Sequence, residues 1–229
     1  MARQVKRRTI DSPLRREQAA QTRQRILAAA RRLFISRGYV ATTMSAIATE
    51  AGVAAETVYA SAGAKPVILA TLTDQVVAGD DPAPVSHRER VKRLLAEQAP
   101  AQWLGAYADE VRGIQDRWAG MYTAMRHATA ADPQIAALWA DKMQARLDGI
   151  RPLAAALAGR GMLAPGITAD RAADVIWTLG SPETYQLLVF DRGWDPDDYQ
   201  KWLTMTLGQA LLPRAGDPDQ PGTRSPPLT

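Results

Sequence analysis

Two threonines, a tyrosine and a lysine between residues 42 and 65 have the chemistry and the spacing to hold phosphate groups. Thr42 and Thr43 come directly before a short apolar segment, so their hydroxyls would lie beside the free main-chain N–H groups that open a helix, where anions bind. Tyr59 and Lys65 follow further along and supply a hydroxyl and an ammonium group. The sequence therefore predicts that this segment contacts a nucleic-acid backbone.

A second set of residues lies between these phosphate-binding candidates and carries small or methyl-bearing side chains. Such side chains allow close approach to base edges and contact with thymine methyl groups. The expected base-facing residues are Ala54, Ala55, Thr57 and Val58. Because no Arg, Lys, Asn or Gln stands among them, strong bidentate base recognition is not expected. Specificity from Thr57, water, the N-terminal arm or DNA shape remains open.

Three helices are expected to position these side chains. Apolar residues at three- and four-residue spacing predict a helix over 15–37, which Gly38 ends. A helix over about 44–51 follows, and Gly52 permits a sharp turn into a third helix over about 54–60. Two helices joined by a tight turn form a helix-turn-helix, whose second helix enters the major groove of DNA.

The charge distribution agrees with a nucleic-acid partner. Residues 1–65 contain twelve Lys and Arg against four Asp and Glu, whereas the remaining residues contain sixteen against twenty. A basic head on a mildly acidic body is typical of a nucleic-acid binder, although a basic tail that only aids solubility gives the same count. Cysteine is absent, which excludes disulfides and thiolate sites and fits a cytoplasmic protein.

No segment alternates at a period of two, so the sequence predicts an all-α fold. We expect a flexible basic arm (1–14), a helix-turn-helix domain (15–65), a connecting helix (66–79), a second helical domain (80–213) and a disordered tail (214–229). Prolines near proposed helix starts divide the body into helices at about 87–99, 101–130, 132–150, 152–160, 168–180, 182–192 and 196–212.

Aromatic residues and methionines gather on one stripe of the helix over 101–130 and recur in the helices after it. Such a stripe either lines an apolar pocket with a few polar handles or simply forms core. The candidate ligand-binding residues are Trp103, Tyr107, Trp118, Met121, Tyr122, Trp139, Trp177 and Tyr185. Neither His87 nor His127 has a second ligand at metal-binding spacing, so we expect no metal and no cofactor.

The head resembles the DNA-binding domain of the TetR family of bacterial transcriptional regulators. The matching residues are Ile26-Leu27, Ala29-Ala30, Leu33-Phe34, Gly38, Thr42-Thr43, Ile47-Ala48, Ala51-Gly52-Val53, Thr57, Tyr59, Lys65 and Leu69. The resemblance implies that Thr42, Thr43, Thr57, Tyr59 and Lys65 contact DNA. One residue departs from the pattern, because Ala62 stands where the family usually has Phe.

The resemblance also implies that the domain over 80–213 is an effector-binding and dimerisation domain, which binds a small molecule and forms a two-fold dimer through the last two helices. A two-fold dimer would present two recognition helices to the half-sites of a palindrome. The residues expected in that interface, which could instead be buried within the monomer, are Tyr185, Leu188, Val189, Trp202, Leu203, Met205, Leu207 and Leu211.

The function expected from these features is a homodimeric repressor that a small apolar or aromatic effector releases from a palindromic operator. Two alternatives stay open at this point. One is a helical interaction module that does not bind DNA, which the unusually small recognition side chains favour. The other is an all-α enzyme acting on an apolar substrate, although no nucleophile–base pair or metal cluster supports it and the expectation is no enzyme.

Overall fold

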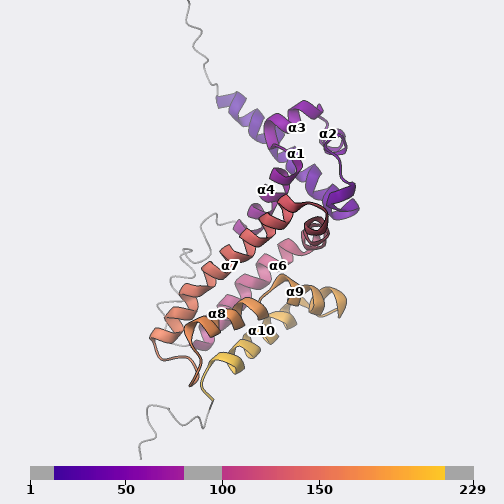
Figure 1. Cartoon of the computed structure of the whole chain (residues 1–229). Coiled ribbons are helices and arrows are strands. Elements are labelled where there is room, and N and C mark those ends of the chain that lie inside the picture. The colour runs from indigo at the N-terminus through magenta and orange to yellow at the C-terminus, as the bar shows by residue number, and fades with distance from the viewer. Residues whose placement is uncertain (1–12, 80–99, 215–229) are drawn as a thin grey trace, which may run out of the picture. The chain divides into compact units, whose positions relative to one another are not determined.

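The structure, a computed structural model, describes residues 13–79 and 100–214, and within these ranges it contains helices and no strand (Figure 1). The predicted all-α fold is confirmed. The helices are α1 (Pro13–Ala41), α2 (Met44–Ala51), α3 (Ala55–Ala62), α4 (Lys65–Ala78), α6 (Pro100–Ala131), α7 (Pro133–Gly159), α8 (Ala169–Leu179), α9 (Pro182–Tyr185), the π-helical turn η2 (Gln186–Asp191) and α10 (Pro196–Leu211). No helix among the described residues is long and apolar enough to cross a membrane.

The chain divides into two compact units. The first contains the residues up to Leu72 together with Thr123–Ile135, and the second contains Thr73–Tyr122 and the residues from Ala136 onward. The expected division placed all of residues 80–213 in one domain, so it differs in the segment Thr123–Ile135, which spans the end of α6 and the start of α7. The expected helix over 87–99, most of the arm and most of the tail lie outside the described residues.

The core of the first unit follows the apolar spacing of α1. Ile26, Ala30 and Phe34 are each fully buried, together with Ile47 of α2 and Val58 of α3. α1 begins at Pro13, two residues earlier than expected, because proline is well tolerated in the first turn of a helix. Its regular geometry breaks at Gly38, as predicted, where φ 80° and ψ 163° lie in a region open essentially only to glycine.

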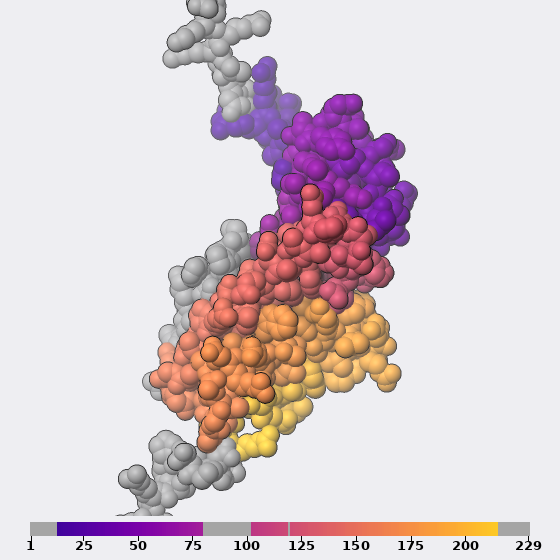
Figure 2. Space-filling view, viewed as in Figure 1, coloured from indigo at the N-terminus to yellow at the C-terminus, as the bar shows by residue number. Residues whose placement is uncertain are grey.

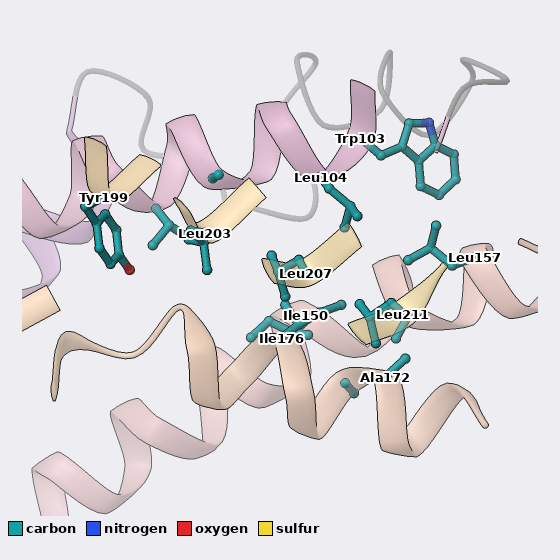
Figure 3. Packing of buried hydrophobic residues seen from close by; sticks show 14 of the residues in the cluster. Trp103, Leu104, Ile150, Leu157, Ala172, Ile176, Tyr199, Leu203, Leu207 and Leu211 are labelled. Atoms are coloured by element: carbon teal, nitrogen blue, oxygen red, sulfur yellow. The ribbon is translucent and has the colours of Figure 1, made fainter. Parts of the chain in front are cut away.

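The core of the second unit is built around α10. Leu203, Leu207 and Leu211 recur every four residues, are fully buried, and belong to one cluster with Ile150 of α7 and Ile176 of α8 (Figure 3). Each buried leucine contributes roughly 1.5–3 kcal/mol relative to an exposed one. The leucines expected at a dimer interface are therefore core residues of the monomer, and so is Tyr185.

Two predicted helix boundaries are wrong. The helices expected over 132–150 and 152–160 are one helix, α7, with Pro152 inside it. The apolar stripe continues across the proline, since Ile150, Ala154 and Leu157 are all buried, and this burial outweighs the hydrogen bond that proline removes. The helix expected over 182–192 is α-helical only as far as Tyr185 and then widens into η2.

Candidate nucleic-acid interface and ligand cavity

The connection between α2 and α3 has the geometry of a tight helix-turn-helix turn. The Thr43 hydroxyl accepts a hydrogen bond from the Ala46 N–H at 3.1 Å and so caps the start of α2. Gly52 ends α2 in the left-handed conformation (φ 66°, ψ 42°), and its N–H donates to the Thr49 carbonyl. The Val53 N–H then donates to the Ala48 carbonyl at 3.0 Å. These bonds fix the direction in which α3 leaves the turn.

Several predicted DNA contacts lie on the surface of this motif. Thr43, Ala54 and Tyr59 are exposed, with 54% of the Tyr59 side chain accessible, and Ala55 and Thr57 are half-buried. A large aromatic side chain that remains this exposed on a short helix contributes little to folding and is available to a partner. The exposed Thr43 hydroxyl can still donate to a phosphate, because its hydrogen bond to Ala46 uses only a lone pair.

The structure corrects the roles expected for Thr42 and Val58. Both are fully buried. The Thr42 hydroxyl donates to the Gly38 carbonyl at 2.8 Å, so it holds the α1–α2 connection instead of facing a phosphate. Val58 points into the core between α3 and the other two helices of the head, which is the position that its apolar side chain and the helical period favour.

Lys65 also has an internal role. Its ammonium group donates to the carbonyl oxygens of Tyr39 and Thr42, at 3.0 Å each, and lies 4.2 Å from the centroid of the Tyr39 ring. Burial lowers the pKa of Lys65, and the nearby Asp132 carboxylate opposes that effect. Two of the three N–H donors are thus used within the protein, which leaves one for a phosphate.

Sequence reasoning missed three contacts that hold the head together. Arg23 of α1 donates to the Ser61 carbonyl near the end of α3 at 2.6 Å. The Tyr39 hydroxyl donates to Asp132, and burial together with this carboxylate raises the pKa of Tyr39. Arg32 pairs with Glu50 at 3.0 Å on the surface. The partners are 18 to 93 residues apart, so no local spacing signals them.

The recognition helix α3 carries one ionisable side chain outside its Tyr59 phenol, the exposed Glu56 in its first turn. Sequence reasoning did not single it out, although a carboxylate on such a helix can accept a hydrogen bond from the amino group of cytosine. Ala62, which stands where an aromatic residue was expected, is 1% exposed. Its surroundings therefore close over a methyl group, and α3 stays packed.

A cavity of about 500 Å³ lies within the second unit. Four of the eight predicted ligand-binding residues line it, namely Trp103, Tyr107, Trp118 and Trp139. Its volume is in the range that holds drug-sized molecules. The aromatic stripe of α6 was expected either to line a pocket or to form core. Trp103 and Trp118 do both, because they line the cavity and are almost fully buried.

The other four predicted ligand-binding residues do not line the cavity. Met121 is fully buried, and Tyr122 packs edge-on against Trp139 with 6.1 Å between ring centroids. The Trp177 indole donates to the Met143 carbonyl. Tyr185 packs against Tyr199. Tyr122, Trp177 and Tyr185 are each held by a neighbour, which helical spacing alone does not reveal.

The polar groups of the cavity wall come from three helices. Tyr107 of α6 lies 3.4 Å from the Ile176 carbonyl, to which its hydroxyl donates, and burial raises the pKa of this phenol while the neighbouring Arg146 opposes the rise. Gln115 donates to the Gly180 carbonyl, and Lys142 pairs with Asp74. Residues 13–79 and 100–214 hold no group of three or more metal-ligating side chains.

The comparisons with known proteins agree with this geometry. The sequence profile of the bacterial regulatory proteins of the tetR family matches residues 26–70, and no curated protein matches the chain. NalD, the secondary repressor of the MexAB-OprM multidrug efflux pump in Pseudomonas aeruginosa, shares the fold with a TM-score of 0.62 at 22% identity, over 86% of this chain and 98% of its own. SmeT in complex with triclosan shares the fold with a TM-score of 0.67 at 19% identity, over 91% of this chain and 99% of its own. A regulator from Saccharomonospora viridis in complex with choline has a TM-score of 0.64 at 21% identity, over 85% of this chain and 100% of its own.

The matched segment, residues 26–70, begins within α1 and contains the whole of α2, the turn and α3. It also contains every residue on which the predicted phosphate and base contacts were placed. NalD and SmeT share the fold of this chain along nearly the entire length of their own chains. Residues 26–70 thus match the tetR family of bacterial regulatory proteins, and the chain shares the fold of NalD.

Proposed function

We propose that the protein is a homodimeric transcriptional repressor that acts in the cytoplasm and that a small apolar or aromatic effector releases from a palindromic operator. The helix-turn-helix carries this proposal. α2, the Gly52 turn and α3 are fixed by main-chain hydrogen bonds, and Thr43 and Tyr59 remain exposed on them. An exposed hydroxyl at the start of α2 and another on α3 suit the phosphates that flank a major groove.

The cavity supports the ligand-responsive part of the proposal. NalD is a repressor of a multidrug efflux pump, and SmeT has been solved with triclosan, so regulators with this fold include repressors and small-molecule binders. In this chain Trp103, Trp118 and Trp139 give the cavity aromatic walls. An effector that binds them would shift the population toward a conformation that no longer fits the operator.

An apolar surface on the second unit supports the dimer. Leu187, Phe190, Trp194 and Met205 are between 37% and 58% exposed. Leu187 and Phe190 belong to η2 and Met205 to α10, the region expected to pair, and the orange segment that contains η2 is visible on the surface in Figure 2. Several large apolar side chains exposed near one another in sequence mark a protein–protein interface. Met205 was among the residues first expected there, and Leu187, Phe190 and Trp194 replace the buried leucines of that set.

A selection on genomic DNA followed by binding measurements tests the proposal. The protein should enrich palindromic fragments and bind them more weakly as salt increases. Tyr59→Phe should weaken operator binding about five- to tenfold, the effect of one lost hydrogen bond, and Tyr59→Ala should weaken it further. Val67→Ala, at an exposed position of α4, serves as the control.

The choice of Tyr59 over Lys65 follows from the structure, because Lys65→Ala would also break two hydrogen bonds within the head. The fold of each variant is checked by circular dichroism. If no fragment is enriched at modest salt, or if Tyr59→Ala binds the operator as tightly as the unmodified protein, the proposed function is wrong. In that case an interaction module that does not bind DNA becomes the better description.

A further inference from the structure

The cavity wall contains a guanidinium group, that of Arg146, one of whose nitrogens lacks a hydrogen-bond partner. Nη1 of Arg146 is buried and makes no hydrogen bond with any described residue. The guanidinium is held in place, because Nη2 donates to the Trp177 carbonyl and the guanidinium carbon lies 5.3 Å from the centroid of the Trp177 ring. A guanidinium keeps its charge under all ordinary conditions, so this N–H remains an unused donor on a permanent cation.

The other charged groups of the wall already have partners. Lys142, one turn before Arg146 on α7, pairs with Asp74. The Asp148 carboxylate accepts a hydrogen bond from Arg151 at 2.7 Å, and Glu110 also interacts with another group of the protein. Arg146 is therefore the group of the wall whose charge lacks compensation from a hydrogen-bonded acid in the described part of the chain.

The neighbouring residues make this donor suitable for an acceptor carried by a ligand. The Tyr107 phenol lies close enough to Arg146 for the guanidinium to oppose the effect of burial on its pKa. Ile114, Trp118, Ile150 and Leu153 supply hydrocarbon to the same wall. A buried guanidinium among aromatic and aliphatic side chains binds carboxylates well, because its planar fork matches their two oxygens and few water molecules compete.

We propose that the effector is an organic acid, whose apolar body fills the cavity and whose carboxylate accepts a hydrogen bond from Nη1 of Arg146. The inference rests on the proposed ligand-responsive function and narrows it to one class of molecule. Tryptophan side chains also attract cations, but Arg146 would repel a cation bound beside them. The cavity should therefore prefer anions over cations.

Matched ligands test the charge requirement on the unmodified full-length chain. The probes are 2-naphthylacetate, 2-naphthylacetamide and 2-(2-naphthyl)ethylamine, which present nearly the same body with a negative, neutral or positive group. Binding is followed by calorimetry. The acid should bind at least tenfold more tightly than the amide, and the amine should bind most weakly. Equal affinity for the acid and the amide, or tighter binding of the amine, would overturn the proposal.

Variants then assign the preference to Arg146. Arg146→Met keeps much of the side-chain length and should abolish the difference between acid and amide, whereas Arg146→Lys should retain part of it. Arg171→Met is the control, because Arg171 lies on α8 of the same unit, is exposed and does not line the cavity, whereas Arg151 pairs with Asp148 of the wall. An acid preference that survives in folded Arg146→Met would also overturn the proposal, and Arg146→Lys serves if that variant does not fold.

Operator release separates this inference from the proposed function. If the acid binds through Arg146 and releases the protein from operator DNA in a fluorescence anisotropy assay, both stand. If it binds with the expected preference but leaves the DNA complex intact, the acid site stands and ligand-responsive repression fails. If only the amide or the amine releases DNA, ligand-responsive repression stands and the acid site is wrong.

Discussion

The Tyr39 hydroxyl donates a hydrogen bond to the Asp132 carboxylate, 93 residues further along the chain, with 3.2 Å between the two oxygens. The other oxygen of Asp132 accepts from the Gln134 N–H at 2.9 Å, at the start of α7. The Lys65 ammonium group lies over the Tyr39 ring and bonds its carbonyl. One aromatic residue thus joins the α1–α2 connection, the start of α4 and the segment between α6 and α7 within the first unit.

Tyr39→Phe should destabilise the first unit by about 1–2 kcal/mol, because it removes a hydrogen bond to a charged acceptor and keeps the buried ring. The urea midpoint of unfolding measures the change. Asp132→Asn is the matched variant, because its one amide oxygen can still accept from the Gln134 N–H and its amide nitrogen can donate to the Tyr39 hydroxyl oxygen, so it should be less destabilising. An unchanged midpoint in Tyr39→Phe would contradict the assigned role.

Tyr199 and Tyr185 form a contrasting pair in the second unit. Their rings pack edge-to-face with centroids 4.8 Å apart. The Tyr199 hydroxyl is buried and without a hydrogen-bond partner, whereas the Tyr185 hydroxyl donates to Asp116. Tyr199→Phe should therefore raise the free energy of unfolding by about 1 kcal/mol, because it removes an unsatisfied polar group, and Tyr185→Phe should lower it.

Thermal and urea unfolding of the two variants provide the measurement. Because the substitutions are chemically identical and the rings are neighbours, differences in hydrophobic transfer largely cancel between them. Opposite signs support the pairing described. A destabilised Tyr199→Phe would contradict this account, because it would mean that the Tyr199 hydroxyl has a hydrogen-bond partner, such as a bound water molecule, outside the contacts within the chain.

The buried tyrosines predict a loss of stability at high pH. Burial raises the folded-state pKa of Tyr39, Tyr185 and Tyr199 above the ordinary value of 10.0. Below pH 10 the phenols are protonated in both states, and their contribution is fully present. Above it the unfolded chain releases protons first, so the free energy of unfolding falls by up to about 1.4 kcal/mol per pH unit for each phenol.

Lys65 changes the free energy of unfolding in the opposite direction. Its folded-state pKa is lowered, so the cost of burying its charge disappears as it loses its proton with rising pH. Three phenols outweigh one ammonium group, so the net change with rising pH is a loss. Urea unfolding between pH 8 and about 11.5 measures it. Tyr39→Phe should make the decline less steep than in the unmodified protein, and an equally steep decline would show that this phenol does not contribute.

The sequence was sufficient for the fold class and the turn, and it singled out the exposed residues of the proposed DNA-binding surface, because each depends on local signals. Gly38 and Gly52 stand where the backbone needs positive φ, and Thr43 stands where a helix needs a cap. Thr42 and Val58 were misassigned because a residue type does not reveal which way its side chain points. Burial depends on how α1, α2 and α3 pack.

The cavity was only partly predictable for the same reason. Helical spacing placed Trp103, Tyr107 and Trp118 on one stripe of α6, and all three line the cavity. Arg146 gave no signal in the sequence, since a basic residue on an amphipathic helix is usually solvated. Its importance comes from Trp177, 31 residues away, which holds the guanidinium beside the cavity.

Gly63 and Gly52 predict different costs for the same substitution. Gly63 follows α3 with φ 86° and ψ −166°, a conformation open essentially only to glycine, and an added Cβ would lie 3.0 Å from a Val67 methyl carbon. Gly52 is left-handed, and no atom lies within 4 Å of its added Cβ. Gly63→Ala should cost about 2–3 kcal/mol and Gly52→Ala about 1 kcal/mol. Equal urea midpoints for the two variants would contradict this account.

A charge placed on the exposed apolar surface tests how the proposed dimer forms. Leu187 is 58% exposed on η2, a segment without buried residues, so Leu187→Glu leaves the core of the second unit intact. Within a dimer interface the new carboxylate would be desolvated without a partner, at a cost of several kcal/mol. Size-exclusion chromatography with light scattering should therefore give half the mass of the unmodified protein.

Leu14→Glu is the matched control, because Leu14 is 61% exposed on α1, outside that surface, and this variant should remain dimeric. Leu187→Glu should also lose most of its operator affinity, since a monomer presents one recognition helix to one half-site. Retained affinity for a single half-site, measured with a fragment that carries one, would separate the loss of the dimer from damage to the head. A Leu187→Glu protein that stays dimeric and binds the whole operator normally would place the interface on another surface.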